Sequence, residues 1–454
     1  MDAPQTARAP SIDEPLWGAQ TALAIVNFPI SGVPLDLRIV HALCAIKRHA
    51  ATVNHERDVA GVDADIATAI AAACAQIEAG AHADAFVVDT YQTGSGTSTN
   101  MNVNEVVGTL ASRAIGRPVH PNDHVNASQS SNDVVPSAIR IAVSVVVARA
   151  LVPALDLLID RLAVAETRFA HVVKAGRTHL MDAAPVTLGQ EIGAWSYAFE
   201  LARARVAADL VHLGELPLGG TATGTGLNAP AGFGAEVADR LAIEMGLPLR
   251  AAATTSARMA HQGGQGTLAD SSATLRSVAI ALTKMANDIR LLSSGPLTGL
   301  GELRVPALQP GSSIMPGKVN PVLCETANQV AARVFGNDAT IAYASSQGIL
   351  ELNTYLPVIG QALLESAHLL STTCAVFADR LVAGLEADEE RCRRNAHRTP
   401  ALATVLGPLI GYDRAAEVVK EALATDATIL DVALAHGYGT AAELDTVLDP
   451  STMV

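Results

Sequence analysis

Apolar residues recur every three or four positions over long stretches of this chain, and this spacing constrains the fold more than any other feature. Such a repeat places the apolar side chains along one face of a helix. It predicts five long helices, which run through 134–162, 192–213, 268–292, 323–334 and 356–377. Segments rich in glycine and proline separate them, so we expect a mostly α-helical fold with an elongated central bundle.

The composition favours helices that pack closely against one another. Hydrophobic residues make up 49% of the chain, but aromatic residues only 3%. The core must therefore be filled by small aliphatic side chains, and alanine is the best helix former, whereas a β-sandwich would need more aromatic and β-branched residues. Several helices carry apolar residues on more than one face, so we expect bundles from several subunits to pack together. The alternative is a monomeric bundle with alanine-rich surfaces.

The pattern divides the chain into three expected domains. They are an N-terminal domain of short helices and polar loops at 1–127, the long-helix bundle at 128–388, and a small C-terminal domain at 389–454. Within the bundle, Thr187 and Gln190 form a capping-box pattern that predicts a helix start, and Gly214 predicts the end of the same helix.

Several classes of protein are disfavoured. The net charge is −14, from 31 basic and 45 acidic residues, which argues against nucleic acid or an anionic membrane as a partner. No segment reaches the roughly 18 uncharged residues of a membrane span. Met1–Pro10 lacks the apolar core of a signal peptide and is expected to be a loose tail. The five cysteines are scattered without a CxxC motif, so we expect a cytoplasmic protein with reduced thiols.

Four segments are unusually rich in glycine, hydroxyl groups and amides for so apolar a chain. They are 93–100, 128–133, 176–179 and 311–320. Three of them run into a predicted long helix or closely precede one. A helix N-terminus offers free N–H groups and a positive dipole end, which together favour an anion. The four segments therefore predict a small polar pocket for a carboxylate or phosphate ligand.

Other motifs are not supported. Gly311 to Lys318 resembles a nucleotide-binding P-loop, but five residues separate its glycines instead of four, and Val319 stands where a magnesium ligand belongs. His120 and His124 flank a Pro-Asn turn, with no third metal ligand nearby in the sequence. Zincin, α/β-hydrolase and Rossmann motifs are absent. We expect neither a metal nor a cofactor.

The polar segments resemble one known superfamily. Gly311–Asn320 resembles the signature loop of the fumarase/aspartase superfamily, while Thr93–Glu105 and His120–Pro136 resemble class II fumarate hydratases. Further similarity covers 176–190, 219–228, 284–301, 411–413 and 449–450, so it spans most of the chain. The resemblance implies a three-domain, mostly helical subunit and a homotetramer. The central helices of four subunits would form one bundle, and each active site would take residues from three subunits.

The resemblance also implies a reaction, the reversible hydration of fumarate to malate in the tricarboxylic acid cycle. It implies that Ser312 takes a proton from carbon, giving an aci-carboxylate that preorganised donors stabilise. His179, oriented by Glu325, would handle the water on the opposite side. The implied substrate-binding residues are Ser95, Thr97, Ser130, Ser131, Asn132, Thr178, Lys318 and Asn320. A second dicarboxylate region would comprise Arg117, His120, Asn122 and Asp123.

A serine can act as this base only if its oxygen is held in an alkoxide-like state by N–H groups and positive charge. The glycine-rich backbone, Lys318 and a helix beginning at Asn320-Pro321 are expected to supply that field. Proline suits a first helical turn and asparagine suits an N-cap, so Asn320 is expected to cap this helix.

Some motifs favour other members of the superfamily. Ser130–Asp133 has the fumarase form, but Asn27–Gly32, Asn320–Val322 and Pro357–Gly360 lean toward aspartate ammonia-lyase. Fumarases and aspartate ammonia-lyases both normally carry an acidic residue where this chain reads Ala257-Arg258-Met259-Ala260. Aspartate ammonia-lyase or another succinyl-compound lyase therefore remains an alternative. A crystallin-like or catalytically inactive binding protein is a third, against which the retained site residues argue.

Overall fold

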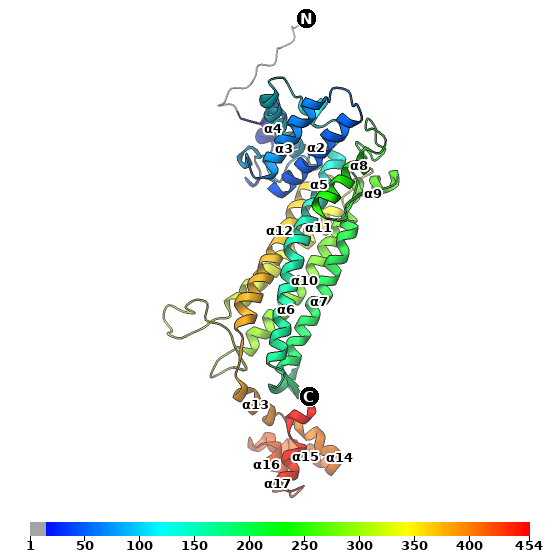
Figure 1. The fold of residues 1–454 in the computed structure, drawn as a ribbon. Helices are drawn as coiled ribbons and strands as arrows, with labels where there is room; N and C mark the ends of the chain where they lie inside the picture. Colours follow the sequence, from blue (N-terminus) through cyan, green and yellow to red (C-terminus); the bar gives the residue numbers. More distant parts are fainter. Residues whose placement is uncertain (1–14) are drawn as a thin grey trace. The chain divides into compact units, whose positions relative to one another are not determined.

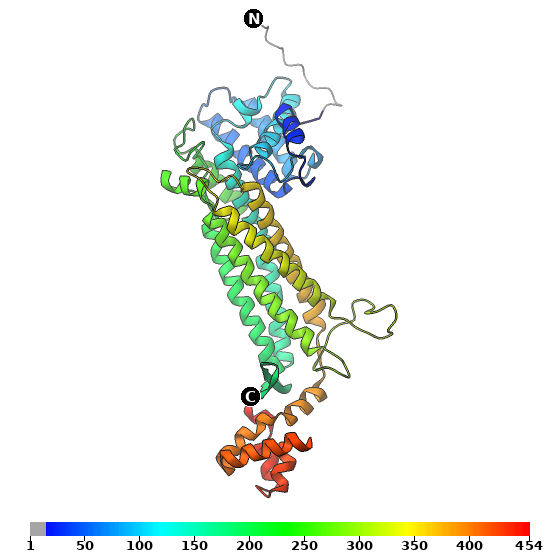
Figure 2. The same cartoon turned by 180° about the vertical axis from the view of Figure 1, so that it is seen from behind.

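The computed structural model describes residues 15–454, so the predicted tail at Met1–Pro10 lies outside the described residues. The protein is mostly helical, as predicted, and forms two compact units. The first comprises Met1–Pro153, Arg203–Ala279 and Ala332–Thr372, and the second comprises Ala154–Ala202, Ile280–Ala331 and Thr373–Val454. Segments of the same long helices contribute to each unit, where they lie side by side (Figures 1 and 2).

The first unit contains the N-terminal helices and several short elements. Its elements are α1 (Ala19–Asn27), α2 (Leu37–Glu56), α3 (Ala64–Glu78), η1 (Ala83–Ala85), α4 (Thr97–Ile115), η2 (Pro121–Val125), α5 (Ser131–Val146), η3 (Val147–Leu151), β3 (Glu215–Leu216), α8 (Phe233–Met245), β4 (Arg250–Ala251) and α9 (Thr255–Gly263). The expectation of only short helices before residue 128 is wrong, because α2 has 20 residues and α4 has 19. Strands β3 and β4 form a parallel pair.

The second unit contains a β-hairpin and the C-terminal helices. Its elements are β1 (Val173–Thr178), β2 (Met181–Thr187), β5 (Leu303–Arg304), η4 (Phe377–Leu381), η5 (Val382–Gly384), β6 (Glu386–Ala387), α13 (Glu389–Arg398), η6 (Pro400–Leu406), α14 (Gly407–Ile410), α15 (Tyr412–Thr425), α16 (Ile429–Ala435), α17 (Ala441–Val447) and η7 (Pro450–Met453). β1 pairs with β2 and β5 with β6, both antiparallel. A separate hydrophobic cluster joins Leu402, Leu406, Val418 and Ile429. The three-domain division stays a prediction.

All five predicted long helices are present. They are the run of α5, η3 and α6 (Val152–Arg168), then α7 (Leu188–Leu213), α10 (Gly266–Leu292), α11 (Val322–Ser345) and α12 (Leu356–Val376). The capping box at the start of α7 is confirmed, because the Gln190 N–H donates to Thr187 Oγ1 at 3.0 Å and the Thr187 N–H donates to Gln190 Oε1 at 2.9 Å. The helix ends at Leu213, directly before Gly214.

Small residues let the helices approach closely. Gly360 lies on α12 in the first unit, and a Cβ there would lie 2.8 Å from Ile39 Cδ1 and 2.9 Å from Ile139 Cγ1. Both isoleucines are fully buried, on α2 and α5. Even one methyl group at position 360 would therefore separate three packed helices.

One helix among the described residues is long and apolar enough to cross a membrane, judged by length and composition alone. It is Ser131–Arg168, and half of its most apolar window is buried within the protein. A single helix of this kind is weak evidence for a membrane span, since core helices of soluble proteins meet the same criteria.

All five cysteines are free and buried. Burial raises the pKa of the Cys324, Cys374 and Cys392 thiols to about 12, and that of Cys44 is raised as well. A thiol with so high a pKa stays protonated at neutral pH and is a weak nucleophile.

We predict that Gly360→Ala destabilises the protein by about 1–3 kcal/mol, because the added methyl group overpacks a rigid core. Gly266→Ala is the matched control, since no atom lies within 4 Å of a Cβ at that helical position. Thermal unfolding measures both effects. A midpoint for Gly360→Ala that equals the wild type would contradict the packing argument.

Candidate active site

The glycine-rich segment before α4 is fixed by close backbone contacts in the first unit. The Leu356 N–H donates to the Gly94 carbonyl at 3.0 Å, and a Cβ on Gly94 would lie only 1.8 Å from the Thr354 carbonyl oxygen. The predicted residues Ser95 and Thr97 lie together there, with their hydroxyl oxygens 2.7 Å apart. Both side chains are partly exposed, so a ligand can reach them.

The second polar segment forms the N-terminus of α5. Ser130 is the N-cap, and its hydroxyl accepts a hydrogen bond from the Asn132 N–H at 3.2 Å. Asn100, in the first turn of α4, donates through Nδ2 to Ser131 Oγ at 3.1 Å. The Asn132 side chain donates to the Ala222 carbonyl at 2.9 Å. The structure therefore brings three predicted substrate-binding residues together and connects them to α4.

Asp133 holds this segment against a third loop. Its carboxylate accepts backbone N–H groups from Ser130, Gly219 and Thr221, at 2.9, 3.0 and 3.0 Å. Burial raises the pKa of Asp133 to about 6, although these three donors oppose the rise. Asp133 thus positions the neighbouring serines and has no water-facing surface of its own.

Lys47 supports the same segment from α2 and was missed by the sequence analysis. Its ammonium group is completely buried and donates to Asn126 Oδ1 and Gln129 Oε1, both at 3.3 Å. Burial lowers the pKa of Lys47 to about 8. The available signal was a lysine on the apolar face of a helix, between Leu43 and Ala50.

The residues of the expected second dicarboxylate region lie around η2. His120 Nδ1 lies 3.1 Å from Asp123 Oδ2, and Asn122 is exposed on the same turn. Arg117 instead pairs with Asp63, at 2.6 Å. His120 and Asp123 therefore contact each other, whereas Arg117 forms its ion pair with Asp63, outside the predicted region.

The stretch without the family's acidic residue forms α9. Thr254 caps this helix, and Ala260 is exposed. Next to Ala260, His261 Nδ1 lies 3.3 Å from Nη2 of the fully buried Arg140. Burial lowers the pKa of Arg140 to about 10, and its Nε and Nη1 atoms have no hydrogen-bond partner. This stretch therefore lies beside a buried cation that, among residues 15–454, forms no ion pair with a carboxylate, although the charges of Glu215 and Asp209 act on it.

Thr178 and His179 lie at the turn of the β1–β2 hairpin in the second unit. Thr178 pairs with Met181, so His179 and Leu180 are the two central residues of the turn. Both have left-handed backbones, with φ of 56° and 62°, as a type I′ hairpin turn requires. The side chains of Thr178 and His179 are exposed. Cavities of about 260 and 420 Å³ adjoin this turn, and Arg177 and Leu180 line both.

The signature loop is closed by its own backbone. The Gly311 N–H donates to the Lys318 carbonyl at 3.0 Å, and a Cβ on Gly311 would lie 2.2 Å from that oxygen. Ser312 Oγ accepts the N–H groups of Ile314 and Met315, both at 3.2 Å. The loop thus aims two backbone donors at the predicted base.

Asn320 closes the loop rather than capping the following helix. Its side chain donates to the Gly311 carbonyl at 2.8 Å, and α11 begins at Val322, so the expected capping role is wrong. Lys318 is exposed, as is Glu325 in the first turn of α11. No hydrogen bond or ion pair of the described residues joins His179 to Glu325 or Ser312. The orientation of His179 by Glu325 stays a prediction.

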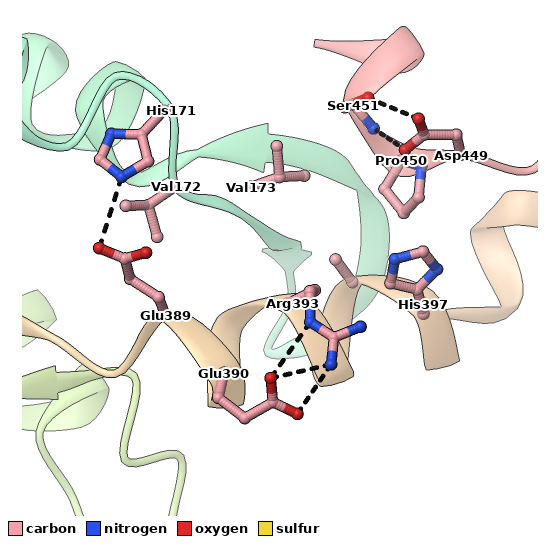
Figure 3. A pocket seen from close by; sticks show the side chains of 11 residues that line it. His171, Val172, Val173, Glu389, Glu390, Arg393, His397, Asp449, Pro450 and Ser451 are labelled. Carbon is pink, nitrogen blue, oxygen red and sulfur yellow. Dashed lines mark hydrogen bonds and ion pairs between the residues drawn. The ribbon is translucent and has the colours of Figure 1, made fainter.

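A further cavity in the second unit contains none of the predicted site residues. It measures about 360 Å³ and is lined mainly by His171, α13 and the start of η7. Figure 3 shows two ion pairs in this cavity, His171 with Glu389 at 3.4 Å and Arg393 with Glu390 at 2.8 Å. Within residues 15–454, no group of three histidine, cysteine or acidic side chains is placed to hold a metal.

Comparisons with known proteins support the resemblance that these loops indicated. The profile of a lyase family matches residues 9–336, and that of the fumarase C C-terminus matches residues 402–454. The chain is 48% identical to class II fumarate hydratase of Corynebacterium glutamicum, over 96% of this chain and 93% of the relative. It is 49% identical to the Mycobacterium tuberculosis protein of that name, over 93% of this chain and 88% of the relative.

Solved structures give the same result. The crystal structure of a class II fumarase from Schistosoma mansoni superposes with a TM-score of 0.93 and 36% identity, covering 98% of this chain and 96% of that one. The family profiles cover most of the chain, and the relatives exceed two-fifths identity over nearly all of it. The chain therefore belongs to the class II fumarate hydratase family of lyases.

Proposed function

We propose that this protein catalyses the reversible hydration of fumarate to malate. The observation that carries the proposal is the closed signature loop, in which two backbone N–H groups point at Ser312 Oγ. Preorganised donors of this kind stabilise negative charge on oxygen without reorganisation during the reaction. They supply what a serine needs to act as a base, with the exposed Lys318 adding positive charge nearby in the sequence.

In the direction from malate, Ser312 takes the proton from the carbon next to a carboxylate. The C–H electron pair moves into that carboxylate and forms the aci-carboxylate. Collapse of this intermediate forms the double bond and expels the hydroxyl group from the neighbouring carbon. His179 donates a proton to the departing group, which leaves as water. Fumarate hydration is the reverse.

The remaining polar residues hold the two carboxylates. We assign Ser95, Thr97, Ser130, Ser131, Asn132, Thr178, Lys318 and Asn320 to this set. Hydroxyl and amide groups bind carboxylates through hydrogen bonds, and a lysine adds charge. Arg117, His120, Asn122 and Asp123 are kept as a candidate second dicarboxylate region.

We also propose that the active protein is a homotetramer with shared active sites. Large apolar side chains are exposed on the long helices, including Tyr197 and Leu201 on α7 and Phe335 and Tyr343 on α11. Large apolar side chains exposed along a helix are typical of a surface that another subunit covers. In the described part of the second unit, no hydrogen bond or ion pair joins the hairpin turn to the signature loop, which supports a site completed by residues from other subunits.

A cytoplasmic location and a role in the tricarboxylic acid cycle complete the proposal. The free, buried thiols suit a reducing compartment, and the acidic charge suits a soluble enzyme.

We predict that the purified protein consumes malate and forms fumarate, whose conjugated double bond absorbs ultraviolet light. Malate, aspartate and other substituted succinates should be offered in parallel. Absorbance should rise with malate and not with aspartate. Activity with aspartate alone would make the protein an ammonia-lyase instead.

We predict that Ser312→Ala lowers kcat by roughly 10²–10⁴-fold, because it removes the base. Ser313→Ala is the matched control, since it removes a neighbouring exposed hydroxyl and should cost far less. Circular dichroism should show an unchanged helix content in both variants. Near-normal turnover by Ser312→Ala would refute the assignment of the base.

We predict a mass of four chains in sedimentation experiments. Replacing Tyr197 and Leu201 with glutamate should lower both the mass and the activity, because charges on an apolar interface oppose association. Leu423→Glu is the control, because Leu423 is exposed on α15, outside the long helices. An active monomer would contradict the shared site.

A further inference from the structure

A cluster of buried charges adjoins the hairpin turn that carries Thr178 and His179. Its members are Lys174, Arg177, Glu191, Glu302 and Asn395, all in the second unit, and we call them the Glu302 cluster. None of these residues has a role in the reaction proposed above. A charge network buried next to two site residues requires an explanation, because burying charges is costly unless they are fully paired.

Glu302 is the centre of this cluster, and its side chain is 0% exposed. Its carboxylate accepts both ends of the Arg177 guanidinium, at 2.9 and 2.7 Å. Lys174 Nζ lies 3.2 Å away, and the Asn395 amide donates at 2.9 Å. A two-bond fork between arginine and a carboxylate fixes the relative orientation of both groups.

The backbone of Glu302 is held as firmly as its side chain. Its N–H donates to the Leu292 carbonyl at the end of α10, at 2.9 Å. Its carbonyl accepts from the N–H of Asp388, the N-cap of α13, at 3.0 Å. Glu302 therefore connects two helices to Arg177, the last residue before Thr178.

The charges within the cluster balance. Lys174 is 1% exposed and also contacts Glu191 Oε1 at 2.8 Å, so two cations face two carboxylates. Burial opposes ionisation of Glu302, but the Arg177 hydrogen bonds and the Lys174 charge hold its pKa below the ordinary value. Glu302 is thus ionised in the neutral range, and its carboxylate is paired with both Arg177 and Lys174.

The turn itself needs external support. His179 and Leu180 are consecutive residues with left-handed backbones, and neither is a glycine. Such conformations are unfavourable for ordinary side chains and persist only where the surroundings impose them. Arg177 pairs with Asp182 in the hairpin ladder and with Glu302 outside it. It is therefore the point at which the cluster can fix the turn.

We propose that Glu302 is a positioning residue, which holds the Thr178–His179 turn in its strained, reactive geometry through Arg177. This inference rests on the proposed hydratase function for its kinetic consequence. Its structural consequence, an immobilised turn, does not depend on that function. Glu302 has no contact with substrate in this account and acts only through its neighbour.

Glu302→Gln is the primary test, because it keeps the shape of the side chain and removes its charge. Misplacing a site by about 1 Å can cost roughly 10²-fold, so we expect kcat/KM to fall by about 10- to 100-fold. KM should rise while kcat falls, since Thr178 and His179 move together. A mere loss of folded enzyme would lower apparent kcat and leave KM unchanged.

Arg304→Gln is the matched control. Arg304 lies two residues from Glu302 and pairs with Asp388 at 2.7 Å, so its loss weakens the same region without touching the hairpin. Hydrogen exchange of the 176–182 backbone should accelerate in Glu302→Gln and not in Arg304→Gln. Arg177→Lys keeps the charge but loses the two-bond contact with Glu302. It should change KM, kcat and exchange in the same directions, by smaller amounts. It replaces Glu302→Gln if that variant does not fold.

The outcomes separate the two proposals. Unchanged KM together with unchanged exchange at the turn in both Glu302→Gln and Arg177→Lys would overturn the positioning role, whatever the wild-type activity. A wild-type protein that does not hydrate fumarate would overturn the proposed function. Accelerated exchange confined to the turn would then still support the role of Glu302.

Discussion

Close contact between long helices requires small side chains where the helices face one another. Gly360 illustrates this constraint, since even a methyl group at that position would meet Ile39 and Ile139 at less than van der Waals distance. A chain with 3% aromatic residues can satisfy this requirement along many helices. The packed helices anchor the polar loops that begin or end on them. Ser130, for example, caps α5, whose following turns are buried.

The polar loops hold their exposed hydroxyl groups in place in the same way. Backbone donors and acceptors, rather than side-chain packing, define their shape. Asp133 collects three N–H groups, and Gly94 and Gly311 allow carbonyl oxygens to approach where any other residue would collide. The net charge of −14 belongs to the chain as a whole and does not fix the charge at a single loop, such as the one that carries the exposed Lys318.

Local patterns in the sequence predicted the features that depend on nearby residues. The helix period, the Thr187–Gln190 capping box and the stop before Gly214 all act within one or two turns. The composition of the hydroxyl-rich loops located them, and the resemblance supplied roles for their residues. The Glu302 cluster could not be predicted in this way, because Glu302 meets Arg177 across 125 residues of chain. The role expected for Asn320 was wrong because its side chain closes the loop onto the Gly311 carbonyl instead of capping the helix.

The five buried cysteines have a practical consequence. Cys44 and Cys74 lie in the first unit, whereas Cys324, Cys374 and Cys392 lie in the second. Because each thiol is covered, a labelling reagent can reach it only after the surrounding helices separate. The chain therefore carries natural reporters of partial opening in both units, and the order in which the five sites become labelled records which unit loosens first.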